Sequence, residues 1–89
     1  MLHNEVRRLV IKMHPKDNVL VALTDLPRNE KVIFEGLIYE LQDDVKAKHK
    51  FYTTDLYTGD EGIMYGVLVG KAQCDVAKGS LMTVENLKH

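Results

Sequence analysis

The sequence has no excess charge of either sign, no long apolar run and no pair of cysteines. Its 12 lysines and arginines face 13 aspartates and glutamates, which gives a formal net charge of -1. Because proteins that bind a phosphate backbone usually carry a basic excess, a nucleic-acid partner is disfavoured. No apolar stretch approaches the roughly 20 residues that a membrane-spanning helix needs, so no membrane partner is expected.

The N-terminus and the single cysteine bear on the cellular compartment. Residues 1–15 lack the long apolar core of a signal peptide, and Cys74 has no second cysteine with which to form a disulfide. Both features favour a cytoplasmic protein. Cys74 is disfavoured as a catalytic nucleophile because no histidine or asparagine lies near it in the sequence, so we expect an ordinary small residue beside a turn.

The size and composition describe one small folded domain. A chain of 89 residues and 10.2 kDa has room for a single core. With 45% hydrophobic and 28% charged residues, it has the composition of a globular protein rather than a disordered segment. We therefore expect residues 1–89 to form one domain.

Short apolar runs predict a mainly β protein. Residues 5–13 are few and rich in β-branched side chains, which favours a strand. Residues 18–23 are a continuous apolar run of strand length, which predicts a strand buried on both faces. The best helical candidates are single turns at 25–29 and 52–56, and no helix longer than about three turns is expected.

Glycines divide the remaining apolar runs. Residues 31–42 contain two strand-like halves around Gly36, where a glycine permits the positive φ of a hairpin turn. Residues 63–74 contain short runs separated by Gly66 and Gly70, which predicts small strands with bends or bulges.

A five-residue motif that begins with aspartate occurs four times, at 25–29, 44–48, 55–59 and 75–79. An aliphatic residue follows each aspartate, and Gly, Asn or Lys holds the fifth place. We predict turns in which the carboxylate accepts a backbone N–H two or three residues on, and in which the fifth residue is left-handed. The irregular spacing indicates turns within one domain rather than a solenoid. Carboxylates used in this way disfavour a metal site built from the four aspartates.

Four separate segments resemble one known family in order and spacing. They are "IKMHPKDNVLVALTDLPRNEKV", "VKAKHKFYTTDLYTGDE", "MYGVLVGKAQCDVAKG" and "TVENLKH", and the likeness spans about Val10 to His89. The chain resembles the N-terminal domain of altronate dehydratases, in the wider altronate and galactarate dehydratase family. That module is a SAF domain, named for its similarity to sialic acid synthase and antifreeze proteins, so the resemblance implies a small β-clip fold.

The resemblance implies one part of a hydro-lyase. Altronate dehydratases convert D-altronate to 2-dehydro-3-deoxy-D-gluconate and water in hexuronate catabolism, and the family generally depends on a divalent metal, usually iron(II). The full chains carry a much larger region, in which most catalytic groups are expected. We therefore expect either an N-terminal domain or a small subunit, inactive alone and without its own metal, whose partners are the large catalytic region and a sugar acid.

The C-terminal tail departs from the usual pattern of the family. Most members end the module with His-x-His-Asn, and the matching positions here hold Thr83, Val84, Glu85 and Asn86. A glutamate can serve as a general acid or base, so Glu85 is the candidate catalytic residue, with Thr83 and Asn86 as candidate substrate-binding residues. If the segment is extended, Thr83 and Glu85 face the ligand while Val84 anchors the strand in the core. Without the resemblance, a solvated chain end explains Glu85 and Asn86 equally well.

A second polar feature of the family is Gly-His-Lys, which His49 and Lys50 match in this chain, whereas Lys48 replaces the glycine. A histidine beside lysines can hydrogen-bond a sugar-acid carboxylate, so His49 and Lys50 are candidate substrate-binding residues. On residue types alone, a His49 that braces the neighbouring turn is favoured. Tyr65 and Gly66 also match the family, and we expect Tyr65 in the core with its hydroxyl at the edge.

Two classes of function stay open. One is an accessory, substrate-binding domain of a dehydratase. The other is a free-standing binding or interaction module without catalysis, because SAF-like domains also occur in pilus and flagellar assembly proteins and in antifreeze proteins. The threonines are not spaced as one strand face, which weighs against ice binding, and the flagellar alternative lacks an export signal.

Overall fold

The computed structural model describes residues 8–89, and every regular element in this range is a β-strand. The strands are β1 (Val10–Ile11), β2 (Val19–Ala22), β3 (Lys31–Phe34), β4 (Leu37–Glu40), β5 (Lys50–Tyr52), β6 (Glu61–Met64), β7 (Val67–Ala72) and β8 (Leu87–Lys88). The described residues contain no helix long and apolar enough to cross a membrane. The prediction of a mainly β domain is confirmed, and the arrangement is consistent with a small SAF-type β-clip fold.

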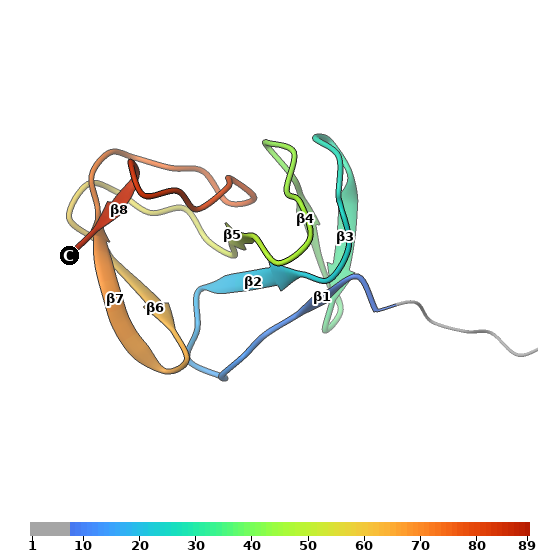
Figure 1. Cartoon of the computed structure of the whole chain (residues 1–89), viewed down its shortest axis with the longest axis horizontal. Coiled ribbons are helices and arrows are strands. Elements are labelled where there is room, and N and C mark those ends of the chain that lie inside the picture. Colours follow the sequence, from blue (N-terminus) through green and yellow to red (C-terminus); the bar gives the residue numbers. More distant parts are fainter. Residues whose placement is uncertain (1–7) are drawn as a thin grey trace, which may run out of the picture.

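The strands form three small antiparallel sheets, ordered β1-β2-β5, β3-β4 and β6-β7-β8 (Figure 1). The strand expected within residues 5–13 is present as β1, and residues 5–7 lie outside the described range. The predicted hairpin turn between β3 and β4 is present, with φ of 51° at Glu35 and 80° at Gly36. The β6–β7 hairpin turns in the same way at Tyr65 and Gly66, and its register shifts between Gly62 and Ile63, as expected for strands with a bulge.

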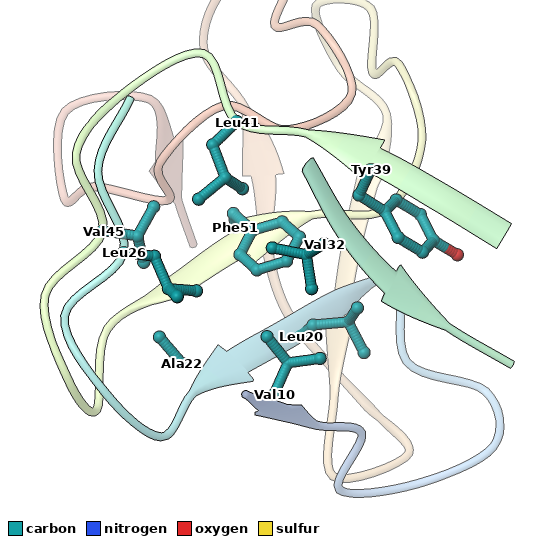
Figure 2. Packing of buried hydrophobic residues seen from close by; sticks show 9 residues of the cluster. All are labelled: Val10, Leu20, Ala22, Leu26, Val32, Tyr39, Leu41, Val45 and Phe51. Carbon is teal, nitrogen blue, oxygen red and sulfur yellow. The ribbon is translucent and has the colours of Figure 1, made fainter. Parts of the chain in front are cut away.

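Strand β2 is buried on both faces, as its continuous apolar run predicts. Leu20 and Ala22 pack into one cluster of buried residues, and Val19 packs into a second. Strand β5 contributes to both clusters in the same way, through Phe51 on one face and Tyr52 on the other. Figure 2 shows the first cluster, with Phe51 surrounded by side chains from four strands and two turns. The two strands therefore form a partition between two small cores.

The four aspartate motifs form turns, and each carboxylate bonds the backbone of a partner turn. The Arg28 N–H donates to Asp44 Oδ1 and the Ala47 N–H donates to Asp25 Oδ1, each at 2.8 Å. Between the two bonds, Leu26 and Val45 form an antiparallel bridge. The expectation that each carboxylate bonds its own turn is wrong, because the accepted N–H groups lie 16 and 22 residues away in sequence.

The second pair of turns repeats this geometry. The Thr58 N–H donates to Asp75 Oδ1 and the Lys78 N–H donates to Asp55 Oδ1, again at 2.8 Å. Leu56 and Val76 form the corresponding bridge. The chain therefore contains two copies of one unit, each with a hairpin between a reciprocal pair of turns.

The fifth residue of each aspartate motif has a left-handed backbone conformation, as predicted. The φ angles are 74° at Asn29, 76° at Lys48, 92° at Gly59 and 90° at Gly79. The places expected to form single helical turns, 25–29 and 52–56, contain these bridged turns and the end of β5 instead. Tyr65 was also placed wrongly, because it occupies a hairpin turn and its side chain is 57% exposed.

Candidate functional site

The residues from Thr83 to Asn86 form a compact turn, here called the tail turn. The Leu87 N–H donates to the Thr83 carbonyl at 3.1 Å, which closes the turn. Thr83 and Asn86 also cap each other: the Asn86 N–H donates to Thr83 Oγ1 at 3.1 Å, and the Thr83 N–H donates to Asn86 Oδ1 at 3.0 Å. The extended segment considered from the sequence is therefore not formed. Val84 does not anchor the core, because its side chain is 77% exposed.

Asn86 connects the tail turn to the interior. Its Oδ1 accepts a second hydrogen bond, from Tyr52 Oη at 2.7 Å, and its Nδ2 donates to the Leu81 carbonyl at 2.9 Å. Its carbonyl accepts the Gln73 N–H at 3.0 Å. Both lone pairs of Oδ1 are therefore occupied, and one side-chain N–H has no hydrogen-bond partner within residues 8–89. A substrate-binding role for Asn86 stays a prediction, whereas its part in holding the turn is direct.

The tail turn borders a groove of about 470 Å³, here called the tail groove. Four of the five candidate site residues line it: His49, Lys50, Thr83 and Glu85. Apolar side chains complete the lining, contributed by Val69, Leu81, Met82, Val84 and Leu87. The fold therefore brings His49 and Lys50, which follow the first unit, to the same surface as two residues of the tail turn, Thr83 and Glu85.

Backbone hydrogen bonds fix the positions of His49 and Lys50 at one side of the tail groove. The His49 N–H donates to the Lys46 carbonyl at 2.9 Å, and the His49 carbonyl accepts the Ala22 N–H at 2.8 Å. Lys50 then begins β5, and its carbonyl accepts the Met82 N–H at 2.9 Å, which joins β5 to the segment before the tail turn. Within residues 8–89, the imidazole of His49, the ammonium of Lys50 and the carboxylate of Glu85 form no hydrogen bonds. These groups are therefore free to meet a ligand.

The lining chemistry suits a small polyhydroxy acid. An ammonium can pair with a carboxylate, an imidazole and a hydroxyl can bond sugar hydroxyls, and a glutamate can give or take a proton. A metal ion is a poorer fit for this surface alone. Among the described residues, no three His, Cys, Asp or Glu side chains are placed to hold a metal ion together.

Tyr52 was not identified from the sequence as a residue that supports the tail turn. Its side chain is fully buried and its hydroxyl supports Asn86 from beneath the tail turn. Burial, with a smaller contribution from Cys74, raises the pKa of the Tyr52 phenol to about 12. The available signal was the run Lys50-Phe51-Tyr52, in which strand alternation sends the two aromatic rings to opposite faces.

The raised pKa of Tyr52 predicts a loss of stability at high pH. The folded protein holds the phenolic proton more tightly than the unfolded chain, in which the pKa is 10.0. The stability from this group is therefore complete below pH 10 and is lost as the pH rises toward about 12. Urea unfolding at a series of pH values measures it, with Tyr52→Phe as the control. If the variant loses stability as steeply as the parent over this range, the prediction is wrong.

Comparison with known families identifies the family of this chain. The model of the altronate/galactarate dehydratase SAF domain matches residues 8–89. The chain belongs to this family. The resemblance inferred from the four sequence segments is thus confirmed, and the tail groove is a feature of a SAF domain.

Curated relatives of this SAF domain are whole dehydratases. It is 36% identical over 78 residues to "Altronate dehydratase" of Bacillus subtilis (strain 168) and 38% identical over 78 residues to "Altronate dehydratase" of Escherichia coli (strain K12). Each match covers 88% of this chain and 16% of the relative. The SAF domain therefore corresponds to about one sixth of those proteins.

Proposed function

We propose that this SAF domain is the accessory, substrate-binding part of an altronate dehydratase, and that the tail groove is the surface it presents to the sugar acid. The observation that carries the proposal is the gathering of His49, Lys50, Thr83 and Glu85 in one groove. These residues come from two polar segments that are far apart in sequence, and the described structure gives three of them no other polar partner.

Each residue has a role that suits the dehydration of a sugar acid. The Lys50 ammonium pairs with the substrate carboxylate, and His49 and Thr83 bond its hydroxyls. Dehydration needs a base to take the α-proton and an acid to protonate the leaving hydroxyl, and Glu85 supplies one of these two groups. Its exposed position at the rim lets the carboxylate reach a substrate held between this domain and a facing surface.

The larger region of the dehydratase supplies what the SAF domain does not have. A dehydration site must be enclosed and must contain both an acid and a base, whereas the tail groove is an open surface with one carboxylate. The described residues do not fit a complete metal site, so the iron(II) or other divalent metal of the full enzyme belongs to the larger region in this proposal. The proposed setting is hexuronate catabolism in the cytoplasm.

A chimaeric enzyme tests the proposal. This chain replaces the matching segment of the B. subtilis altronate dehydratase, and 2-keto acid formation from D-altronate is measured anaerobically with iron(II). We expect turnover by the chimaera and none by this chain alone. Turnover by the isolated chain would contradict the accessory role.

An NMR titration of the isolated chain with D-altronate provides an independent readout. We expect shifts of backbone amides around His49, Lys50 and the tail turn, with L-lysine as a control ligand of the wrong charge. If the tail groove amides do not move and the chimaera is inactive, the remaining alternative is a binding module without a part in dehydration.

A further inference from the structure

A second and larger groove lies at the other side of the β1-β2-β5 sheet. It has a volume of about 970 Å³ and runs between residues 8–15, which include β1, and the β3 strand with its turn. We call it the edge groove. It shares no lining residue with the tail groove, so both can be occupied at the same time. Figure 1 shows β1 and β3 beside each other at this end of the domain.

Strand β1 turns unpaired backbone groups toward the edge groove. Among residues 8–89 it pairs only with β2, and the Leu23 N–H donates to the Leu9 carbonyl at 2.9 Å. Successive residues of an antiparallel strand direct their backbone groups to opposite sides, so Val10 directs its N–H and C=O away from β2. Within residues 8–89, these two groups have no backbone partner.

Strand β3 offers a longer free edge. In the part of the chain that the structure describes, it pairs only with β4, and the Leu41 N–H donates to the Glu30 carbonyl at 2.9 Å. By the same alternation, Lys31 and Ile33 direct their N–H and C=O groups away from β4. Neither residue has a backbone partner on that side in the described part of the chain. Lys31 and Ile33 both line the edge groove, which therefore has two donors and two acceptors along one wall.

The side chains of the edge groove are apolar and basic. Ile33 is 72% exposed and Met13 is 44% exposed, so the groove presents large apolar side chains to solvent. Arg8, Lys12 and Lys31 line the groove, against a single carboxylate from Glu35. The groove thus favours an occupant with apolar and acidic side chains.

We propose that the edge groove receives an extended segment of the larger dehydratase region, which adds a strand to β3 and alternates apolar with acidic side chains. An added strand satisfies the free N–H and C=O groups of Lys31 and Ile33, and its alternate side chains meet the apolar floor and the basic rim. Exposed strand edges with apolar faces are an aggregation hazard that proteins normally cover.

The larger region is the source because this domain spans only 16% of its curated relatives. In those proteins the remaining chain is part of the same molecule, so its effective concentration at this edge is high. The inference rests on the proposed function, since it takes the dehydratase region as the partner. It adds the place and the mode of contact, which the tail groove does not define.

The test uses the part of the B. subtilis altronate dehydratase outside its matching segment, mixed with this chain. We expect binding that protects the amides of Lys31 and Ile33 from hydrogen exchange, measured by NMR. The double variant Lys12→Glu and Lys31→Glu should weaken binding about tenfold or more, because it places like charges against the acidic segment. The control is Lys46→Glu with Lys71→Glu, an equal charge change at exposed positions outside both grooves, which should change binding less than threefold, about the effect of rim charges.

Several outcomes overturn the inference. They are no binding by the parent chain, binding without protection of Lys31 and Ile33, or equal losses from both double variants. Dimers of this chain alone that protect the same amides would assign the groove to a second copy instead. The Glu85→Gln variant separates the two proposals, because it should bind normally but lose turnover. Turnover by the chimaera without protection at β3 would reject this inference and keep the proposed function.

Discussion

Replacement of Gly79 by alanine is expected to destabilise the domain by about 2–5 kcal/mol, the sum of left-handed strain and overpacking. Gly79 has φ of 90°, and a Cβ at this position would collide with the Glu40 carbonyl oxygen. The backbone cannot move aside easily. The Gly79 N–H donates to the Tyr52 carbonyl at 2.8 Å, and its carbonyl accepts the Gln42 N–H at 3.0 Å. Gly79 therefore joins the fourth aspartate turn to the first unit at a point without space for a side chain.

Gly59→Ala is the matched control for this effect. Gly59 has nearly the same φ, 92°, but no atom lies within 4 Å of a Cβ built there. Its replacement should cost about 1 kcal/mol, from conformational strain alone. Urea unfolding of both variants measures the difference, and a Gly79→Ala chain that is unfolded in buffer counts as a loss at least equal to the parent's stability. Equal losses at the two positions would show that the contact with Glu40 has no energetic weight.

Replacement of Glu85 by glutamine is expected to lower the turnover of the complete enzyme by about 100-fold, the usual contribution of a general acid or base. Glutamine keeps the size of the side chain but can neither accept nor release a proton at the working pH. Because Glu85 is exposed on the tail turn, the folded structure should be unaffected. The chimaera with the B. subtilis enzyme provides the assay, with kcat and KM for D-altronate measured separately.

Two further variants make the Glu85 result interpretable. Glu61→Gln makes the same chemical change at another exposed position outside both grooves, and it should leave turnover unchanged. His49→Ala should raise KM more than it lowers kcat if His49 holds the substrate in the ground state. Effects below about threefold at both Glu85 and His49, with unchanged thermal stability, would leave the tail as a solvated chain end.

Much of the fold follows from local patterns in the sequence. Continuous apolar runs mark β2 and its two-sided burial, and glycines mark the β3–β4 turn. The pairing of the aspartate turns does not follow from these patterns, because each carboxylate bonds a turn that is far away in sequence. Side-chain chemistry predicts that a carboxylate accepts an N–H group, but the choice between a local and a distant donor depends on which strands are neighbours.

The structure corrects the expected shape of the tail, whereas the functional roles of the candidate site residues stay predictions. The sequence named four residues that line the tail groove, but it considered an extended tail with Val84 as an anchor. The mutual capping of Thr83 and Asn86 closes a turn instead, and this competes successfully with a strand because both side chains are short and polar. Tyr52 was missed because its partner, Asn86, is 34 residues away.

The reciprocal aspartate bonds also bear on how the chain finds its fold. They close segments of only 16 to 23 residues, and the entropy of closing a loop grows with the logarithm of its length. Most all-β domains fold slowly because their strands pair across long stretches of chain. Here each unit can close its own hairpin and turns before the two units meet through β2, β5 and Gly79. We therefore expect the bonds within each unit to form before the bonds that join the two units.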